Sequence, residues 1–371
     1  MDGIAEEGGP ARNARLLSAS YKDPDVQIDI ILEPNLTPAE VAEIAVAAEA
    51  YGFRTLWHSN YHQNPDAFIA LVPAALATSK IRLGILAVSP YEMQPLKIAN
   101  SLLTLNELSN GRTVVAIGGG GSVMGASGIP QNPTALRMVR GVREAVEITK
   151  SIVSGEASRG YPGEVFKVSR PYHHTWKTAP TAKVFTASTG PKMLEMAGRV
   201  ADGTQMSDVT PEKIEHHMES LRKGLAERET AAEDFRIGNF WAWHIKADPE
   251  QSMYEARREL VYRGEMLPPK YDMTPYVTEE ERALVIEKWA NFAKAFWTRS
   301  GVIDDVPEDI VNRLIAALSS SGGFDAIDEQ IERFGIFEKA GLTELSIRLF
   351  DDPMEGLKTV AEQVLPHFEK Y

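Results

Sequence analysis

The sequence predicts a (β/α)8 TIM barrel, and three observations carry this prediction. From Val26 onward, short apolar runs alternate with helical segments, and eight such units fit in the 371 residues. Runs such as 113–117 are apolar throughout, which is typical of a parallel strand buried on both faces. Glycine-containing turns follow two of these runs. A doubly wound sheet is the alternative, but it would normally carry G-x-G-x-x-G after its first strand, and this spacing is absent.

The strands and helices can be placed in order along the chain. Thr37 begins a helix, because a proline follows it in the first turn and Glu40 completes a capping box. Further helix starts are expected at Thr210, Asp248 and Thr278. Helices are expected over 67–78, 95–108, 134–154 and from Pro191 onward. Strands are expected at 26–32, 54–57, 81–88, 113–117, 183–187, 204–206, 235–245 and 344–350.

The chain is expected to form one barrel domain over residues 26–371, preceded by an N-terminal extension over residues 1–25 that carries little periodicity. The stretch 253–324, after the seventh strand, is too long for one strand–helix connection. It is rich in helix signals and aromatic residues, so we expect a helical insertion that covers the mouth of the barrel. Aromatic residues at helical spacing more often pack a core than line a cavity.

The composition excludes several functional classes. A net charge of −13 argues against nucleic acid or an anionic membrane as the main partner. No segment approaches the roughly 18 apolar residues of a membrane span, and the N-terminus lacks the apolar core of a signal peptide. The absence of cysteine excludes disulfides, thiolate nucleophiles and cysteine-bound metals. A cytoplasmic protein with a small-molecule substrate is therefore expected.

Two glycine-containing segments are the strongest functional signals. In 105–121, a helix ends at Asn110-Gly111, a strand follows, and four glycines come directly after it. Such a run lets backbone amides approach a flat or phosphorylated ligand, although glycine runs alone are more often flexible turns. In 184–207, a strand leads through Thr189 and Gly190 into a helix, and amides at a helix N-terminus are a natural phosphate site.

Together the two segments resemble the luciferase-like flavin and deazaflavin oxidoreductases, in which the pattern LS-x-GR…G-x-G precedes ASGP…AGR-x-ADG. The resemblance extends from about Val26 to the C-terminus and is weakest over 238–324. It implies a barrel that holds its cofactor at the carboxyl ends of the strands. A homodimer or higher homo-oligomer is expected.

A third segment bears on the cofactor. Val88-Ser89-Pro90-Tyr91, followed by Gln94-Pro95, is similar to the pattern V-T-N-P-Y…P of methylenetetrahydromethanopterin reductases. This similarity implies coenzyme F420 and hydride transfer to or from a small organic substrate. An FMN-dependent monooxygenase using reduced flavin and dioxygen is the alternative. A flavin-binding barrel without catalytic activity is the third hypothesis.

The candidate catalytic residues are Glu33, Asn60 and Tyr61. Glu33 directly follows the first strand, where a carboxylate points toward the mouth of a barrel and can act as general acid or base. A solvated loop residue is the alternative. The reductases resemble this chain in a Glu-x-x-Pro-Asn start, although the spacing here is shorter. Asn60 and Tyr61 occupy the place of an Asp-His pair in the deazaflavin relatives, so Asn60 can still bond to a ring carbonyl.

The resemblance also implies the cofactor contacts. A bulge is expected behind the ring at Ala87, Val88 and Ser89, with a non-prolyl cis peptide bond between Ala87 and Val88. Asn60 is expected beside the ring, and the phosphate is expected at Thr189 and Gly190. The glycine run is expected to form a nearby backbone wall, through Gly118, Gly119 and Gly120. Gly121 falls where some relatives carry glutamate.

Other polar and aromatic residues are weaker candidates. Arg137 and Arg140 head a helix and can reach phosphate, but a solvated helix face is the alternative. No metal is expected, because His58 and His62 lie on a strand end and loop rather than on a helix. Candidates for the substrate pocket, with core packing as the alternative, are His58, His173, His174, Trp176, Trp241, Trp243 and His244.

Overall fold

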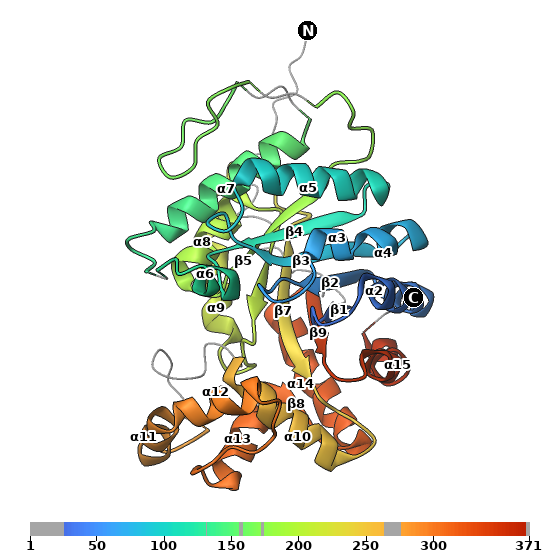
Figure 1. Ribbon diagram of the computed structural model, residues 1–371, viewed down its shortest axis with the longest axis vertical. Coiled ribbons are helices and arrows are strands. Elements are labelled where there is room, and N and C mark those ends of the chain that lie inside the picture. Colours follow the sequence, from blue (N-terminus) through green and yellow to red (C-terminus); the bar gives the residue numbers. More distant parts are fainter. Residues whose placement is uncertain (1–25, 131, 156–158, 172–173, 263–275, 369–371) are drawn as a thin grey trace.

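The computed structural model describes residues 26–130, 132–155, 159–171, 174–262 and 276–368. Eight parallel strands close into a barrel, because each strand pairs with the next, β7 pairs with β9, and β9 pairs with β1 (Figure 1). The expected TIM barrel is therefore confirmed. Its strands are β1 (Gln27–Leu32), β2 (Thr55–Ser59), β3 (Arg82–Val88), β4 (Thr113–Gly118), β5 (Lys183–Ala187), β6 (Gly203–Ser207), β7 (Arg236–Trp243) and β9 (Glu344–Leu349).

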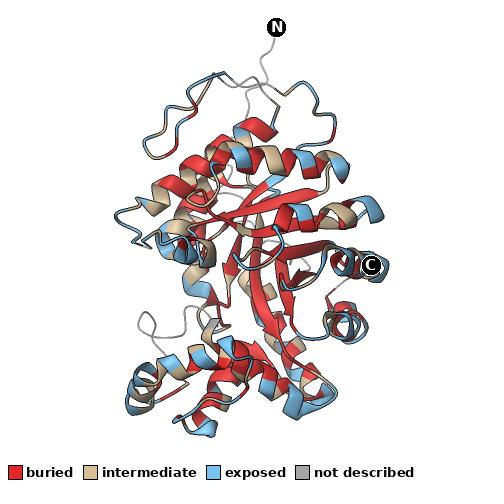
Figure 2. Ribbon diagram, in the orientation of Figure 1, coloured by how far each residue is buried: buried red, intermediate tan, exposed pale blue. Residues whose placement is uncertain are grey.

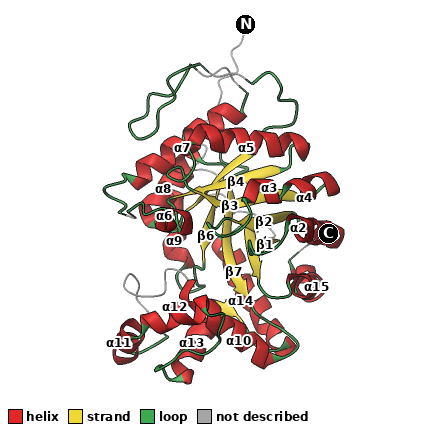
Figure 3. Ribbon diagram, viewed as in Figure 1, coloured by secondary structure: helices red, strands yellow, loops and turns green. Residues whose placement is uncertain are grey.

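Helices surround the strands, as Figure 3 shows. They are α2 (Pro38–Tyr51), α3 (Ala67–Ala70), α4 (Val72–Ala77), α5 (Pro95–Leu108), α6 (Ser122–Ala126), α7 (Met138–Val153), α8 (Pro191–Val200), α9 (Ile214–Ala226), α14 (Ile327–Ala340) and α15 (Pro353–Gln363), with a 3-10 turn η4 (Leu365–His367). Thr37 caps α2 in the expected capping box with Glu40. The helix expected over 67–78 is divided at Leu71, because Pro73 cannot donate a backbone hydrogen bond to the preceding turn. Thr210 does not cap α9, which begins four residues later.

Apolar residues form two layers separated by the strands. The larger layer lies between strands and helices, and the buried residues follow the strands in Figure 2. The smaller layer fills the barrel interior with Ile31, Trp57, Leu86, Val114, Ala116, Phe185 and Phe240. A Cβ on Gly84 would lie 2.2 Å from the Trp57 ring, so the absence of a side chain at Gly84 makes room for this indole.

Between β7 and α14, the described residues include four helices, which form an assembly at one end of the molecule (Figure 1). They are α10 (Pro249–Glu259), α11 (Glu279–Glu287), α12 (Trp289–Trp297) and α13 (Glu308–Leu318), with 3-10 turns η1 (Leu260–Tyr262) and η3 (Phe324–Ala326). Their apolar side chains make a separate cluster around Phe292 and Leu314. Asp248 and Thr278 cap α10 and α11 as expected. The two-residue strand β8 (Ser319–Ser320) pairs with the carboxyl end of β7. The expected extension over 1–25 lies outside the described residues.

The amino-terminal end of the barrel interior holds a buried polar cluster. Glu344 on β9 pairs with Arg236 Nε at 2.9 Å and with Arg82 Nη1 at 3.6 Å. Asp29 on β1 is fully buried nearby. Burial and the charge of Glu344 raise the pKa of Asp29 well above its ordinary value, although Arg82 and Arg236 act in the opposite direction. Among the described residues, no helix has the length and apolar character needed to cross a membrane.

Candidate active site

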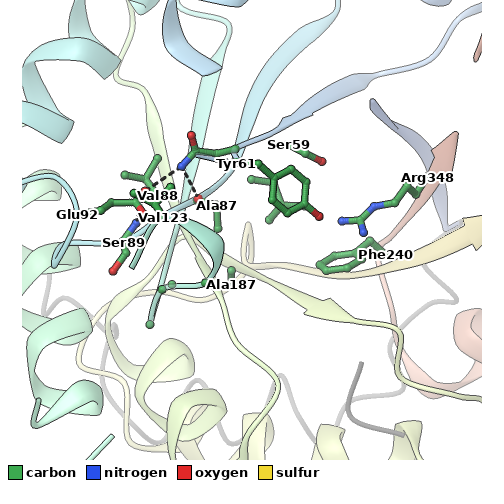
Figure 4. A pocket seen from close by; sticks show the side chains of 16 residues that line it. Ser59, Tyr61, Ala87, Val88, Ser89, Glu92, Val123, Ala187, Phe240 and Arg348 are labelled. Carbon is green, nitrogen blue, oxygen red and sulfur yellow. Dashed lines mark hydrogen bonds between the residues drawn. The ribbon is translucent and has the colours of Figure 1, made fainter. Parts of the chain in front are cut away.

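Two adjoining cavities lie at the carboxyl ends of the strands, the end at which barrel enzymes carry their active sites. The first cavity has a volume of about 210 Å³ and is shown in Figure 4. It is lined by Ser59, Asn60, Tyr61, Leu86, Ala87, Val88, Ser89, Glu92, Gly118, Gly119, Gly120, Gly121, Val123, Ala187, Phe240 and Arg348. The structure thus gathers Asn60, Tyr61, the expected bulge and the glycine run around one space.

One wall of the first cavity consists of small residues from three neighbouring strands. A Cβ on Gly118 would lie 3.2 Å from the Cβ of Ala187 and 3.7 Å from that of Ala87. Gly120 has a φ of +116°, which side chains rarely tolerate, and its Cβ would lie 1.8 Å from Met124 Sδ. Because Gly118, Gly119 and Gly120 line the cavity and have no side chains, their backbone atoms face a ligand directly.

The bulge at the end of β3 is present. Leu86 pairs with Ala116 and Val88 with Ile117, so Ala87 is the extra residue. The expected cis bond between Ala87 and Val88 is wrong by one position, because the cis bond joins Leu86 and Ala87, directly before the bulged residue.

Asn60 and Glu92 hold this bulge. Asn60 Nδ2 donates to the Ala87 carbonyl oxygen at 3.1 Å and to Glu92 Oε1 at 2.8 Å. The backbone N–H of Ser89 also donates to Glu92 Oε1, at 3.1 Å. Burial raises the pKa of Glu92, although the hydrogen bonds from Ser89 and Asn60 oppose this. Glu92 was missed by sequence reasoning, since its only signal is its place three residues after Ser89.

An ion pair connects the two cavities. Arg348 on β9 points into the barrel, where its guanidinium lies 4.7 Å from the Phe240 ring centre and its Nε lies 3.3 Å from Glu33 Oε1. In Figure 4 the Tyr61 ring faces Arg348 and Phe240. Burial lowers the pKa of Arg348, but Glu33, Tyr61 and Asp208 outweigh this and raise it. Arg348 was also missed, although a charged residue between apolar ones near the end of a barrel strand was a readable signal.

The second cavity has a volume of about 330 Å³ and lies between the ends of β1, β2 and β9 and the helical segment. It contains Glu33, so this residue lies at the mouth as expected. Tyr61 lines both cavities. The full lining is Glu33, Pro34, Asn35, Tyr61, His62, Gln63, Asn64, Glu259, Phe296, Trp297, Arg299, Phe350 and Asp351.

Thr189 and Gly190 lie where β5 leads into α8. Ala187, the last residue of β5, lines the first cavity, and Gly190 is the N-cap of α8. The Thr189 hydroxyl accepts a hydrogen bond from the Ser207 N–H at 3.2 Å. Both residues are partly exposed, and a Cβ on Gly190 would meet no atom within 4 Å. The start of α8 is therefore open to a ligand.

Three candidates for the substrate pocket point away from the cavities. Trp241 and Trp243 share one face of β7, as expected, but it is the outer face, where they pack against Phe337 and Phe334 of α14. Their assignment to the pocket is wrong, because the inner positions of β7 belong to the alternate residues. His58 is likewise buried outside the barrel, where Nδ1–H donates to the Ser59 carbonyl oxygen at 2.7 Å. Burial lowers the pKa of His58, which favours the neutral ring.

His174 and Trp176 lie at the opposite end of the barrel, so their assignment to the pocket is also wrong. The nearby Thr178 N–H donates to Glu107, at the C-terminal end of α5, and Lys177 donates to the carbonyl of Ser154, at the end of α7. Helix ends of this kind lead into the amino-terminal ends of strands, away from the mouth. His173 lies outside the described residues.

The remaining weaker candidates have other partners. Arg137 and Arg140 both pair with Glu164, which supports the surface interpretation of these arginines. His244 stacks on Phe350 with ring centres 4.4 Å apart and contacts Glu255 at 2.7 Å, behind the wall of the second cavity. Within the described ranges, histidine and carboxylate side chains form no cluster of three that could hold a metal ion.

A closed parallel barrel with cavities at the carboxyl ends of its strands defines the architecture of a barrel enzyme. The family model for luciferase-like monooxygenases matches residues 21–343, and the chain belongs to this family.

The chain is also similar in sequence or in fold to individual oxidoreductases. The chain is similar to the 5,10-methylenetetrahydromethanopterin reductase of Archaeoglobus fulgidus, with 26% identity over 337 residues, covering 90% of this chain and 97% of the relative. Its fold matches the coenzyme F420-dependent tetrahydromethanopterin reductase of Methanopyrus kandleri, with a TM-score of 0.74, 22% identity, and coverage of 93% of this chain and 99% of that one. It also matches an F420-dependent secondary alcohol dehydrogenase in complex with an F420-acetone adduct, with a TM-score of 0.71, 19% identity, and coverage of 93% and 99%.

Proposed function

We propose that this protein is an oxidoreductase that binds coenzyme F420 in the first cavity and transfers a hydride between it and a small organic substrate. The observation that carries the proposal is the bulge of β3 beside Gly118, the last residue of the neighbouring strand β4. Ala87, Gly118 and Ala187 leave a wall with little side-chain bulk, against which a planar ring can lie. The names of the structurally similar reductase and alcohol dehydrogenase, both of which are F420-dependent, support F420 as the cofactor.

Polar groups in the first cavity fit such a ring. Ser59 Oγ is buried, lines the cavity, and has no hydrogen-bond partner among the described residues, so a ring carbonyl or nitrogen can satisfy it. Asn60 holds the bulge in its position. The amides at Thr189 and Gly190, at the start of α8, would bind the cofactor phosphate.

When bound, F420 supplies a ring carbon that gives or accepts a hydride. The protein supplies orientation and a proton donor or acceptor. Glu33 is the residue proposed for this last role, because it lies in the second cavity beside the first and is held by Arg348. Tyr61 lines both cavities and would contact the substrate.

Separate titrations of the purified protein with F420 and with FMN test the cofactor. We expect F420 to bind at least about tenfold more tightly. Tighter binding of FMN would favour the FMN-dependent monooxygenase, the alternative that the family description supports. Binding without turnover on any tested substrate would favour a non-catalytic barrel, and binding of neither cofactor would contradict the proposal.

The proposal includes a homodimer or higher homo-oligomer in the cytoplasm. A chain without cysteine can form no disulfide, so its fold does not depend on an oxidising compartment. Light scattering coupled to size exclusion would measure the mass of the assembly, and a mass near the 40.9 kDa of one chain would contradict the oligomer.

A further inference from the structure

The second cavity has an aromatic wall at its entrance. Phe296 and Trp297 end α12 with ring centres 5.3 Å apart and nearly perpendicular planes. Phe350 contributes a third ring from the end of β9. Trp297 is 60% exposed, although a large apolar side chain is normally covered. An exposed indole at the edge of a cavity is suited to contact a flat apolar ligand.

The charged groups of this cavity already neutralise one another. Glu259 lies 2.8 Å from Arg258 and 3.0 Å from Arg299. Asp351 lies 2.7 Å from Arg258 and 3.1 Å from Arg299. Arg299 is the one arginine or lysine among the described lining residues, and it forms ion pairs with the carboxylates of Glu259 and Asp351. Glu33 is matched in the same way by Arg348.

An anionic ligand would therefore find no unpaired arginine or lysine among the lining residues that the structure describes. A carboxylate or phosphate that left water for this cavity would either remain unpaired or displace Glu259 or Asp351 from an existing ion pair. An uncharged ligand meets no such penalty, and it can bond to Tyr61 or Asn64 while its apolar part covers the aromatic rings. A cavity of about 150 Å³ accommodates benzene, so 330 Å³ admits a substantially larger molecule.

We propose that the second cavity selects an uncharged substrate with a flat apolar part and rejects phosphorylated or carboxylated molecules. This inference rests on the proposed function, in which the second cavity receives the substrate. It identifies Trp297 as a residue that contacts the substrate, and Asp351 as a residue that determines charge specificity by occupying Arg258 and Arg299.

Two probes of matched shape test the selection. The probes are 4-phenyl-2-butanol, which is uncharged, and 4-phenylbutanoate, which is anionic. Their dissociation constants would be measured by ligand-observed NMR on the full chain, with and without F420, at pH 8, where histidine side chains carry little charge. We expect the alcohol to bind at least about tenfold more tightly than the carboxylate.

Two variants locate the selection in the second cavity. Trp297→Ala should weaken binding of the alcohol about tenfold. Trp176→Ala, which removes an exposed indole at the other end of the barrel, should leave this binding unchanged. Asp351→Asn should strengthen binding of 4-phenylbutanoate at least about fivefold, because Arg258 and Arg299 each lose one of their carboxylate partners. Asp352→Asn, at the neighbouring exposed position, is its matched control and should change neither probe.

The outcomes separate this inference from the proposed function. Equal or tighter binding of the carboxylate to the wild-type protein would overturn the selection, as would undetectable binding of the alcohol or full affinity of Trp297→Ala for it. Unchanged binding of the carboxylate to Asp351→Asn would overturn the role of that residue. Failure of F420 to bind would overturn the proposed function, while the alcohol preference and its loss in Trp297→Ala would still support an apolar, uncharged ligand.

Discussion

At the scale of single residues, the contact between Glu33 and Arg348 joins the two cavities. The guanidinium is buried against the face of the Phe240 ring, and the Glu33 carboxylate lies at the edge of the guanidinium, where the second cavity begins. A carboxylate held by a buried arginine has a defined orientation, which a proton donor or acceptor needs. The same contact gives Glu33 a structural role that must be separated from a catalytic one.

Glu33→Gln is predicted to lower turnover on the true substrate about 10²-fold, because the amide cannot exchange a proton. Cofactor affinity should remain within about twofold, since Glu33 does not line the first cavity. Kinetics, a cofactor titration and a melting curve on the same preparation would test this. Normal turnover, with or without a lower melting temperature, would reduce Glu33 to a structural partner of Arg348.

Glu92→Ala is predicted to weaken cofactor binding about tenfold, because Asn60 and the Ser89 amide lose the acceptor that positions the bulge. Glu92→Gln keeps a carbonyl oxygen at this position and should bind within about threefold of the wild type. Equal affinities of the wild type and the alanine variant would show that the bulge needs no support from Glu92.

At the scale of elements, the strand–glycine–helix junctions after β4 and β5 present backbone to the site. They do so in different ways. Gly120 is held at a positive φ against Met124, whereas Gly121 has a φ of −168° and open space at its Cβ position. The glycines of one run are therefore not equivalent, although the sequence repeats them without distinction.

Gly120→Ala is predicted to lower the free energy of unfolding by about 1–3 kcal/mol, because its Cβ would strain the backbone and collide with Met124. Gly121→Ala should change it by less than about 0.5 kcal/mol. Urea denaturation of both variants would measure the difference, and equal stabilities would contradict the assigned backbone conformation.

Gly190→Trp is predicted to weaken cofactor binding by an order of magnitude or more, because the indole would cover the amides at the start of α8. The fold should tolerate the change, since the φ of Gly190 is −67° and its Cβ position is open. Gly190→Ala is the matched control and should retain affinity. Unchanged affinity of the Gly190→Trp variant for the cofactor would contradict a phosphate site at the start of α8.

At the scale of the whole molecule, the barrel has a polar cluster at one end of its interior and the two cavities at the other. Asp29 belongs to the first of these, far from the proposed chemistry. Its ionisation should therefore affect the stability of the barrel rather than catalysis.

Asp29→Asn is predicted to become more stable relative to the wild type as pH rises. The folded-state pKa of Asp29 lies above its ordinary value of 3.8. At pH values between 3.8 and the folded-state pKa, the folded protein therefore keeps a proton that the unfolded chain releases. The contribution of Asp29 is thus fully present below pH 3.8 and is lost as pH rises through the folded-state pKa. Urea denaturation at pH 4.5 and pH 8 would measure it. Exposed Asp352→Asn should show no such trend, and a pH-independent difference for Asp29→Asn would contradict the prediction.

The sequence by itself determined the order of strands and helices, since apolar runs, caps and glycine turns are local signals. It identified Glu33 at the mouth by the position of this residue after the first strand, whereas the bulge at Ala87 was expected only from the resemblance to the deazaflavin reductases, which placed the cis bond one position too late. It also grouped Trp241 with Trp243 on one face of β7, but it did not determine which face. Both sides of a barrel strand are buried, so apolar character alone does not distinguish the inside from the outside.

Only the tertiary structure decided which distant residues meet. Arg348 reaches Glu33 because closure of the barrel places β9 beside β1, and Glu92 reaches Asn60 because two strand ends converge. The second cavity exists because α12 returns to the ends of β1, β2 and β9 and brings Trp297 beside them. Such contacts depend on the closure and packing of the whole chain, and no local pattern of residues encodes them.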